Sequence, residues 1–355
     1  MYKKTMLLQL SVNNPDMEKI QRAADIIKKG GVVAFPTETV YGLGADALNP
    51  KAVTRVFEAK KRPFDNPPII HIAQQEDLFK LVEKVPRKAK VLLDEFWPGP
   101  LTLVFRRSRI IPEVTVAGLD TVAVRIPKNR VALALITRSE CPIAAPSANL
   151  AGKPSPTNAK HVLDDLEGRI DAVLDGGPTL VGLESTVVDL SRSPPQVLRP
   201  GGISYESLKP ILRNLVLSRS AIADKPIITR KVRSPGMRHK HYAPKAQVVV
   251  VEGNLRSVTR KIRELIRLHA KNGKKVGVLA TEETRYSYAG VIVKSLGSRF
   301  DPEALARNLF AVLREFDTLG VDVIVAEGLP TDGLGLAIMN RLRRASGYTI
   351  VRTCD

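Results

Sequence analysis

Short apolar runs at uneven intervals constrain the fold of this sequence more than any other feature. Between residues 69 and 200 they are IIHIA, LTLVFRR, TVAVRIP, PIAAPSA, DAVLDGG, STVVDLS and PQVLRP. Such runs, rich in Val, Ile and Thr, are typical of β-strands. Because only some of them are separated by enough residues for a helix, we expect an α/β fold with a mixed sheet rather than a regular alternation of strands and helices.

Two helices and a strand are predicted before these runs. The first helix, over residues 15–29, gathers apolar side chains on one face and ends at two glycines; the face consists of Ile20, Ala23, Ala24, Ile26 and Ile27. A strand follows in GVVAFP. The second helix has Asn49 as its N-cap and Pro50 as its first residue, and Pro63 ends it.

The composition and pattern of the sequence change at about residue 203. Residues 219–245 are rich in Lys, Arg and Pro and contain one acid, Asp224, which is typical of a linker. After them the apolar runs AQVVVVEG, KKVGVLAT, AGVIVKSLG and VDVIVAEGL alternate with helical stretches at 254–273 and 301–320. This alternation predicts a small, mostly parallel, Rossmann-like sheet.

The charge of the chain favours an anionic partner. Of 355 residues, 55 are Lys or Arg and 36 are Asp or Glu, which gives a formal net charge of +19. A nucleotide, a nucleic acid or an acidic protein would fit this excess, and a solvated basic surface explains it equally well. Aromatic residues make up 5% of the chain, which argues against single-stranded nucleic acid held on aromatic side chains.

We expect a soluble, cytoplasmic protein without membrane contacts. No apolar run approaches the roughly 20 residues that span a bilayer, and the first residues lack a signal-cleavage pattern. Cys141 and Cys354 lie far apart in the sequence, which excludes a disulfide framework or a cysteine cluster for a metal. Cys141, within an apolar segment, is predicted to lie in the core.

Two glycine-containing segments resemble nucleotide-binding motifs but lack the required context. Gly42–Ala47 is similar to the dinucleotide fingerprint, with Asp65 about 20 residues further on. That fingerprint opens directly onto a helix, whereas here the helix begins later, so we expect a structural turn. The segment GKPS at 152–155 cannot act as a Walker A loop, because its proline lacks an amide that the phosphate cradle needs.

Several polar residues follow or interrupt predicted strands. PTETVYGLG at 36–44 ends a strand in hydroxyls and glycines, either facing a cleft or closing an edge turn. Arg62, after a helix C-terminus, could stabilise the helix dipole or bind phosphate. His71 is either a core histidine or functional. Arg125, inside the apolar run VAVRIP, needs an anionic partner from the protein or from a substrate.

Taken in order, these motifs resemble the YrdC-like threonylcarbamoyl-AMP synthases. They are PTETVYGLG, KRP with NP, VRIP, APSAN with a KPSPT-type loop, ESTVVD and LRPGG, and SPGMRHKHYAP at 234–244 is similar to the linker of the longer Sua5 form. The resemblance implies a YrdC-like catalytic domain at 14–203, with a twisted mixed sheet and a large positive cavity. It also implies a linker or lid at 204–245 and a smaller Rossmann-like Sua5 domain at 246–355.

The resemblance implies a nucleotidyltransferase. It would join L-threonine, bicarbonate or CO2, and ATP into threonylcarbamoyl-AMP with release of diphosphate, as the first step of the t6A modification at position 37 of tRNA. Mg²⁺ would accompany ATP. A tRNA threonylcarbamoyltransferase complex would receive the product, and weak RNA binding is possible in addition.

The resemblance also implies the site residues, position by position. Lys60 and Arg62 are the catalytic cations. The residues expected to bind ATP are Arg62, Asn66, Thr121, Ser147, Ser155, Arg199 and Tyr242. Those expected to bind threonine are Thr39, His71, Arg125, the backbone of Ala145, and Ser185. Arg125 would pair with the α-carboxylate of threonine. The metal ligands stay unassigned.

Two other functions stay open on the residues alone. A non-enzymatic protein that binds double-stranded RNA or tRNA would need a basic surface and little sequence code. A nucleotide-dependent regulatory protein would need a nucleotide site in the second domain, where the sequence offers only the weak motif Gly333-Leu334-Gly335.

Overall fold

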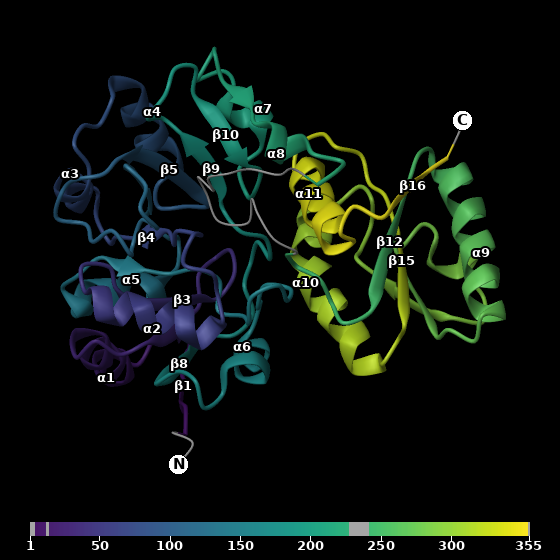
Figure 1. Cartoon of the computed structure of the whole chain (residues 1–355), viewed down its shortest axis with the longest axis horizontal. Coiled ribbons are helices and arrows are strands. Elements are labelled where there is room, and N and C mark those ends of the chain that lie inside the picture. Colours follow the sequence, from purple (N-terminus) through teal and green to yellow (C-terminus); the bar gives the residue numbers. More distant parts are fainter. Residues whose placement is uncertain (1–3, 12–13, 227–240, 354–355) are drawn as a thin grey trace. The chain divides into compact units, whose positions relative to one another are not determined.

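The chain folds into two compact α/β units, shown in the computed structural model of Figure 1. The structure describes residues 4–11, 14–226 and 241–353. Within these ranges, the first unit comprises residues 4–151 and 155–221, and the second comprises 152–154, 222–226 and 241–353. Each unit is built on its own sheet.

The first unit is built on an eleven-stranded mixed sheet with the order β1-β8-β2-β3-β7-β4-β6-β5-β9-β10-β11. Its strands are β1 (Met6–Gln9), β2 (Val33–Phe35), β3 (Gly42–Asp46), β4 (Ile70–His71), β5 (Leu101–Arg106), β6 (Thr121–Arg125), β7 (Ile143–Ala144), β8 (Ala172–Asp175), β9 (Thr186–Asp189), β10 (Gln196–Arg199) and β11 (Val216–Leu217). Neighbours such as β4 and β6 run parallel, whereas β5 and β6 run antiparallel. The predicted mixed sheet is therefore confirmed.

Helices surround this sheet: α1 (Met17–Lys28), α2 (Pro50–Lys60), α3 (Leu78–Leu81), α4 (Arg87–Phe96), α5 (Arg130–Ser139), α6 (Ala159–Leu166), α7 (Tyr205–Leu208) and α8 (Arg219–Ile222), with a 3-10 turn at Gln75–Asp77. Both predicted helices are confirmed as α1 and α2. The side chain of Asn49 accepts hydrogen bonds from the amides of Lys51 and Ala52, and Pro50 is the first helical residue. The helices α4, α5 and α6 were not predicted from the sequence.

The central strand β2 is covered on both faces. Val33 and Phe35 pack with α1 and α5, whereas Ala34, between them, packs with α2 and α6. Alternate residues of a strand point to opposite faces of the sheet, so this pattern places β2 in the middle of three layers. A third apolar cluster joins α4 to the strands β4, β5 and β6 and contains Trp97.

The glycine-containing segment Gly42–Asp46 is the strand β3, so the predicted turn is wrong. β3 pairs antiparallel with β2 on one side and with β7 on the other. A Cβ atom at Gly44 would lie 2.6 Å from Cγ2 of Ile143 and 2.7 Å from the ring of Phe35. The glycine therefore provides room for Phe35 to lie across the strand.

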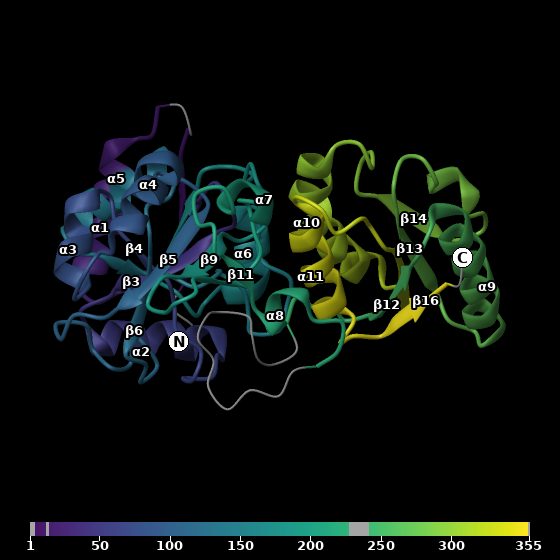
Figure 2. The same ribbon diagram turned by 90° about the horizontal axis from the view of Figure 1, so that it is seen from above.

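The second unit is a parallel five-stranded sheet of order β14-β13-β15-β12-β16. Its elements are β12 (Gln247–Glu252), α9 (Leu255–Lys271), β13 (Val276–Ala280), a 3-10 turn (Arg285–Ser287), β14 (Ile292–Ser295), α10 (Pro302–Leu319), β15 (Val323–Glu327), α11 (Gly335–Ala345) and β16 (Ile350–Arg352). Figures 1 and 2 show α9 on one face of this sheet and α10 with α11 on the other. The predicted Rossmann-like sheet is confirmed.

The segment predicted as a linker or lid, 204–245, has several parts in the structure. α7 and β11 belong to the first unit, where β11 pairs parallel with β10. Residues 227–240, which include most of the segment SPGMRHKHYAP, lie outside the described residues. The lid therefore stays a prediction.

Cys141 is half-buried and packs against the cluster of α1 and α5. Burial, with the nearby carboxylate of Asp46, raises the pKa of its thiol to about 12, so the thiol is protonated at neutral pH. Cys354 lies outside the described residues. Every helix in the described ranges is too short or too polar to cross a lipid bilayer.

Replacing Gly44 by alanine tests the packing of Phe35 across β3. We expect the free energy of unfolding to fall by about 1–3 kcal/mol, because the added methyl group overpacks a closed part of the core. Trp97 is the only tryptophan of the chain and is buried in the first unit, so its fluorescence in a urea titration reports the unfolding of that unit.

Gly42→Ala is the matched control on the same strand. Its Cβ would meet Ala145 and Phe35 at 3.3 Å, which is less crowded than at Gly44. The control should lose less stability than Gly44→Ala. Equal losses in the two variants would show that the space beside Phe35 is not the reason for the glycine at 44.

Candidate functional site

Arg125, at the end of β6, carries a positive charge into the interior of the first unit. Its side chain is 3% exposed. Nε donates to the carbonyl oxygen of Gly99 at 3.0 Å and Nη1 donates to Oγ1 of Thr39 at 3.0 Å. Nη2 lies 2.6 Å from Oε1 of Glu38. The predicted buried charge is thus present, and in this structure its anionic partner is a protein carboxylate.

The hydroxyl of Thr39 is oriented by its neighbours. Thr37 has one hydroxyl hydrogen, which it donates to the carbonyl oxygen of Val40 at 2.7 Å. The 2.7 Å contact between the two threonine hydroxyls therefore requires Thr39 to donate to Thr37. Since Thr39 also accepts from Arg125, its oxygen keeps one lone pair for a further donor, such as a substrate hydroxyl.

His71, at the end of β4, lies beside Arg125. The two residues are register partners in the parallel pair β4–β6, so their side chains are on the same face of the sheet. The ring of Phe35 meets the imidazole edge-on, with the centroids 6.1 Å apart. Burial, together with the charge of Arg125, lowers the pKa of His71 from 6.5 to about 3. His71 is therefore a neutral imidazole at physiological pH.

Ser185 and Arg199 form a second buried cluster. The guanidinium of Arg199 donates to the carbonyl oxygen of Ser185 from Nε at 3.2 Å and from Nη2 at 3.0 Å. Nη2 also lies 3.2 Å from Oγ of Ser185, which contacts the hydroxyl of Thr102 at 2.7 Å. A Cβ at Gly201 would lie 2.3 Å from the carbonyl oxygen of Glu184, so only glycine permits this approach.

The predicted catalytic cations lie at the C-terminus of α2. Lys60 is 1% exposed, and its ammonium group donates to the carbonyl oxygens of Ser147 and Asn149. Arg62 is 7% exposed and donates through Nε to the carbonyl oxygen of Asn66 at 3.0 Å. Lys60 thus contacts the loop that contains Ser147, and Arg62 orders the turn that contains Asn66.

Two further residues expected to bind ATP are buried in the first unit. Oδ1 of Asn66 is buried and has no hydrogen-bond partner among the described residues, so it is an acceptor available to a ligand. Ser155 is fully buried and donates to Oε1 of Glu184 at 2.6 Å.

The remaining predicted residues have different surroundings. Thr121, half-buried, begins β6. Ala145 follows β7, and its amide donates to the carbonyl oxygen of Ile69 at 2.8 Å. Tyr242 belongs to the second unit, where it is buried and its ring stacks on Phe310 with the centroids 5.2 Å apart. Its predicted contact with a nucleotide stays a prediction.

Hydrogen bonds and strand register join nine of the thirteen predicted site residues into four groups. Thr39 contacts Arg125, with His71 beside it in register; Ser185 contacts Arg199; Lys60 contacts Ser147; and Arg62 contacts Asn66. The start of β5 joins two of these groups, because Gly99 accepts from Arg125 and Thr102 contacts Ser185.

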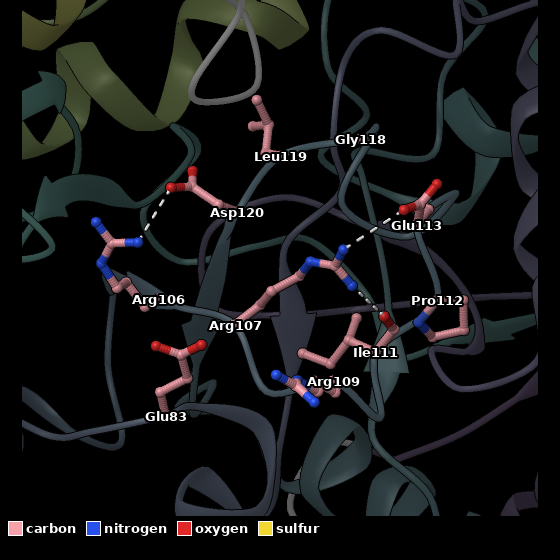
Figure 3. A pocket seen from close by; sticks show the side chains of 10 residues that line it. All are labelled: Glu83, Arg106, Arg107, Arg109, Ile111, Pro112, Glu113, Gly118, Leu119 and Asp120. Atoms are coloured by element: carbon pink, nitrogen blue, oxygen red, sulfur yellow. Dashed lines mark hydrogen bonds and ion pairs between the residues drawn. The ribbon is translucent and has the colours of Figure 1, made fainter.

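A separate surface pocket of about 590 Å³ lies at the other end of β5. Figure 3 shows Arg107 reaching toward Ile111 and Glu113, and Arg106 reaching toward Asp120. The residues that line this pocket include none of the predicted site residues, although Asp120 directly precedes Thr121. Arg106 and Arg107 face acids of the pocket itself, and the predicted triphosphate residues lie elsewhere in the first unit.

Three polar residues of these clusters were not predicted as site residues: Glu38, Thr102 and Glu184. Each is at most 6% exposed and contacts a predicted residue. Glu38 and Glu184 lie within PTETVYGLG and ESTVVD, so the motifs contained the signal. The sequence alone does not show which distant residue each of these acids contacts, and that contact is what makes the acid part of a site.

Known proteins resemble this chain along nearly its whole length. Residues 25–201 match a family model described as "Telomere recombination", and residues 203–347 match a model of the threonylcarbamoyl-AMP synthase C-terminal domain. The chain is 53% identical over 334 residues to a threonylcarbamoyl-AMP synthase of Pyrococcus abyssi, a match that covers 94% of this chain and 96% of the relative. It is 48% identical over 348 residues to that of Bacillus subtilis, covering 97% and 96%.

A solved structure has the same fold throughout. The crystal structure of P. abyssi Sua5 complexed with L-threonine matches with a TM-score of 0.94 at 50% sequence identity, covering 99% of this chain and 100% of the other. The resemblance inferred from the ordered motifs is therefore confirmed.

The neutral state of His71 predicts a pH dependence of stability. In the unfolded chain a histidine binds a proton below about pH 6.5, whereas folded His71 binds one only near pH 3. The unfolded state therefore binds more protons as the pH falls from 7 to 5. This lowers the free energy of unfolding by a contribution on the order of 2 kcal/mol.

His71→Gln should remove this contribution. Urea titrations at pH 7 and pH 5, followed by Trp97 fluorescence, should show a smaller loss of stability for the variant than for the wild type. The comparison with the variant isolates His71 from the other titrating groups. If both proteins lose the same stability between the two pH values, the folded histidine is not held neutral.

Proposed function

The chain belongs to the threonylcarbamoyl-AMP synthase family, in its two-domain Sua5 form, and we propose that it makes threonylcarbamoyl-AMP from L-threonine, bicarbonate or CO2, and ATP. The structural observation that supports this function is the interior guanidinium of Arg125, placed beside the oriented hydroxyl of Thr39 and the neutral imidazole of His71. These groups suit a small polar amino acid that carries a carboxylate and a hydroxyl.

Arg125 binds the α-carboxylate of threonine in this proposal. A guanidinium offers a planar pair of donors that matches a carboxylate, and burial strengthens the interaction. Thr39 and Ser185 recognise the substrate hydroxyl, and the backbone of Ala145 contributes its carbonyl, since its amide is already donated to Ile69. A site built to hydrogen-bond a hydroxyl discriminates against analogues that lack one.

Lys60, Arg62 and Arg199 act on the triphosphate. The carbamate oxygen of threonine attacks the α-phosphorus of ATP, an oxygen–phosphorus bond forms, and the bond to diphosphate breaks. The main obstacle is the negative charge on the phosphates, which cations at fixed positions offset. Asn66, Ser147 and Ser155 add polar contacts to the nucleotide. Thr121 and Tyr242 complete the set of residues proposed to bind ATP.

Mg²⁺ accompanies ATP in this proposal. The described residues contain no group of three or more His, Cys, Asp or Glu side chains that could bind a metal ion by themselves. Mg²⁺ in nucleotide sites is commonly held by phosphate oxygens and water with one or two carboxylates, so the residues present fit an ion delivered with the nucleotide. Such an ion would offset phosphate charge.

The product is a mixed anhydride, which needs an acceptor of the threonylcarbamoyl group. We propose that a tRNA threonylcarbamoyltransferase complex takes it, which makes this reaction the first step of t6A formation at tRNA position 37. The net charge of +19 is compatible with weak contacts to that RNA. Family membership favours the enzyme over a protein that only binds RNA.

Isotope exchange tests the function directly. Labelled diphosphate should enter ATP only when threonine and bicarbonate are both present, because the reverse reaction needs the adenylate. Exchange without threonine would indicate another acceptor. RNA binding with a steep salt dependence and without any exchange would support the non-enzymatic alternative.

Two substitutions should separate the threonine and ATP sides. Arg125→Lys keeps the charge but loses the planar pair of donors, so KM for threonine should rise by about 10- to 100-fold with little change in KM for ATP. Arg62→Ala should lower the exchange rate at saturating threonine by about 100-fold or more.

Arg22→Ala, at an exposed position of α1, is the control for loss of an arginine and should exchange like the wild type. The assignment of the two sides is wrong if Arg125→Lys raises KM for ATP as strongly as KM for threonine. It is equally wrong if Arg62→Ala exchanges at the wild-type rate.

A further inference from the structure

Glu38 is a buried acid to which the proposed function gives no role. It lies in the loop between β2 and β3, and its backbone carbonyl accepts a hydrogen bond from the amide of Val181 at 2.8 Å. Its side chain is 5% exposed, and Oε1 lies 2.6 Å from Nη2 of Arg125. A carboxylate thus already faces the guanidinium that is proposed to bind a substrate carboxylate.

The polar atoms around this ion pair lack hydrogen-bond partners. Among the described residues, neither carboxylate oxygen of Glu38 accepts a hydrogen bond, Nη2 of Arg125 donates none, and Nδ1 of His71 has no partner. The short approach of Glu38 to Arg125 is therefore an ion contact without hydrogen-bond geometry. Buried polar atoms are rarely left in this state, and several of them together indicate a place where a polar ligand binds.

The charges at this place match those of an amino acid. A free amino acid carries a carboxylate and an ammonium group on the same carbon. Without Glu38, Arg125 would pair with the carboxylate of the ligand, but the ammonium group of the ligand would lose its water without compensation, at a cost of several kcal/mol. With Glu38 present, a ligand that has only a carboxylate would be repelled by the negative charge of Glu38. An ammonium group of the ligand that lies against Glu38 removes both costs.

We propose that Glu38 binds the α-ammonium group of the substrate, so that Arg125 and Glu38 together form a receptor for a zwitterion. This inference rests on the proposed function, because it takes the Arg125 contact with the α-carboxylate as its premise. The pair is neutral overall and a zwitterion is neutral overall, so binding replaces one poorly hydrogen-bonded ion contact by two ion contacts. The receptor selects free amino acids against carboxylic acids that lack the amine.

Equilibrium binding of two ligands tests the role of Glu38. L-threonine is compared with (R)-3-hydroxybutyrate, which has the same carboxylate and hydroxyl but no amine, by calorimetry without ATP. Glu38→Gln should weaken threonine binding by roughly 10- to 100-fold, because a charge-assisted hydrogen bond is lost. The same variant should bind 3-hydroxybutyrate as well as the wild type does or better, because a repelling charge has gone.

Two further variants make the result specific. Glu38→Asp keeps the charge and should retain more of the preference for threonine than Glu38→Gln does. Asp171→Asn removes another buried acid of the first unit, one that pairs with Arg55 and belongs to none of the four groups, and should leave the ratio of the two affinities unchanged. Trp97 fluorescence in urea confirms that each variant is folded at the temperature of the measurement.

The outcomes separate this inference from the function on which it rests. If Glu38→Gln weakens the binding of both ligands by the same factor, Glu38 only supports Arg125 and the inference is overturned. The inference is also overturned if neither affinity changes. If wild-type protein binds no threonine and forms no adenylate, the proposed function fails, and the inference fails with it. A selective loss for threonine supports it.

Discussion

A positive charge in the interior of a sheet is the constraint on which the first unit depends. A guanidinium that is 3% exposed has lost nearly all of its water, and polar partners must replace that water. Arg125 finds them in Gly99, Thr39 and Glu38, which come from two separate segments of the chain. One cation thereby connects the end of β6 to the loop after β2 and to the start of β5.

The start of β5 extends this connection toward the second cluster. Gly99 accepts a hydrogen bond from Arg125, and Thr102, three residues later, contacts Ser185, to which Arg199 donates. The proposed amino-acid and nucleotide sides are therefore held by the same short segment. Lys60 and Arg62 are oriented in a different way, because both donate hydrogen bonds to carbonyl oxygens of nearby loops.

Much of the fold could be predicted because its signals are local. The cap at Asn49 and the proline after it define the start of α2 from adjacent residues, and the alternation of strands and helices after residue 246 predicts a parallel sheet. β3 was missed because Gly42 and Gly44 are rare in strands, and their role appears only when Phe35 is seen lying across them. Glu38 was missed for a related reason, since its partner Arg125 is distant in sequence.

The close approach at Gly201 limits how Ser185 and Arg199 can move relative to each other. With no side chain at this position, the backbone after β10 touches the backbone of Glu184 and Ser185 directly. Two backbones in van der Waals contact have no flexible side chain between them to absorb a displacement. A thermal shift of one segment therefore displaces the other by nearly the same amount. We therefore expect the spacing between Ser185 and Arg199 to fluctuate less than the position of either residue in the protein.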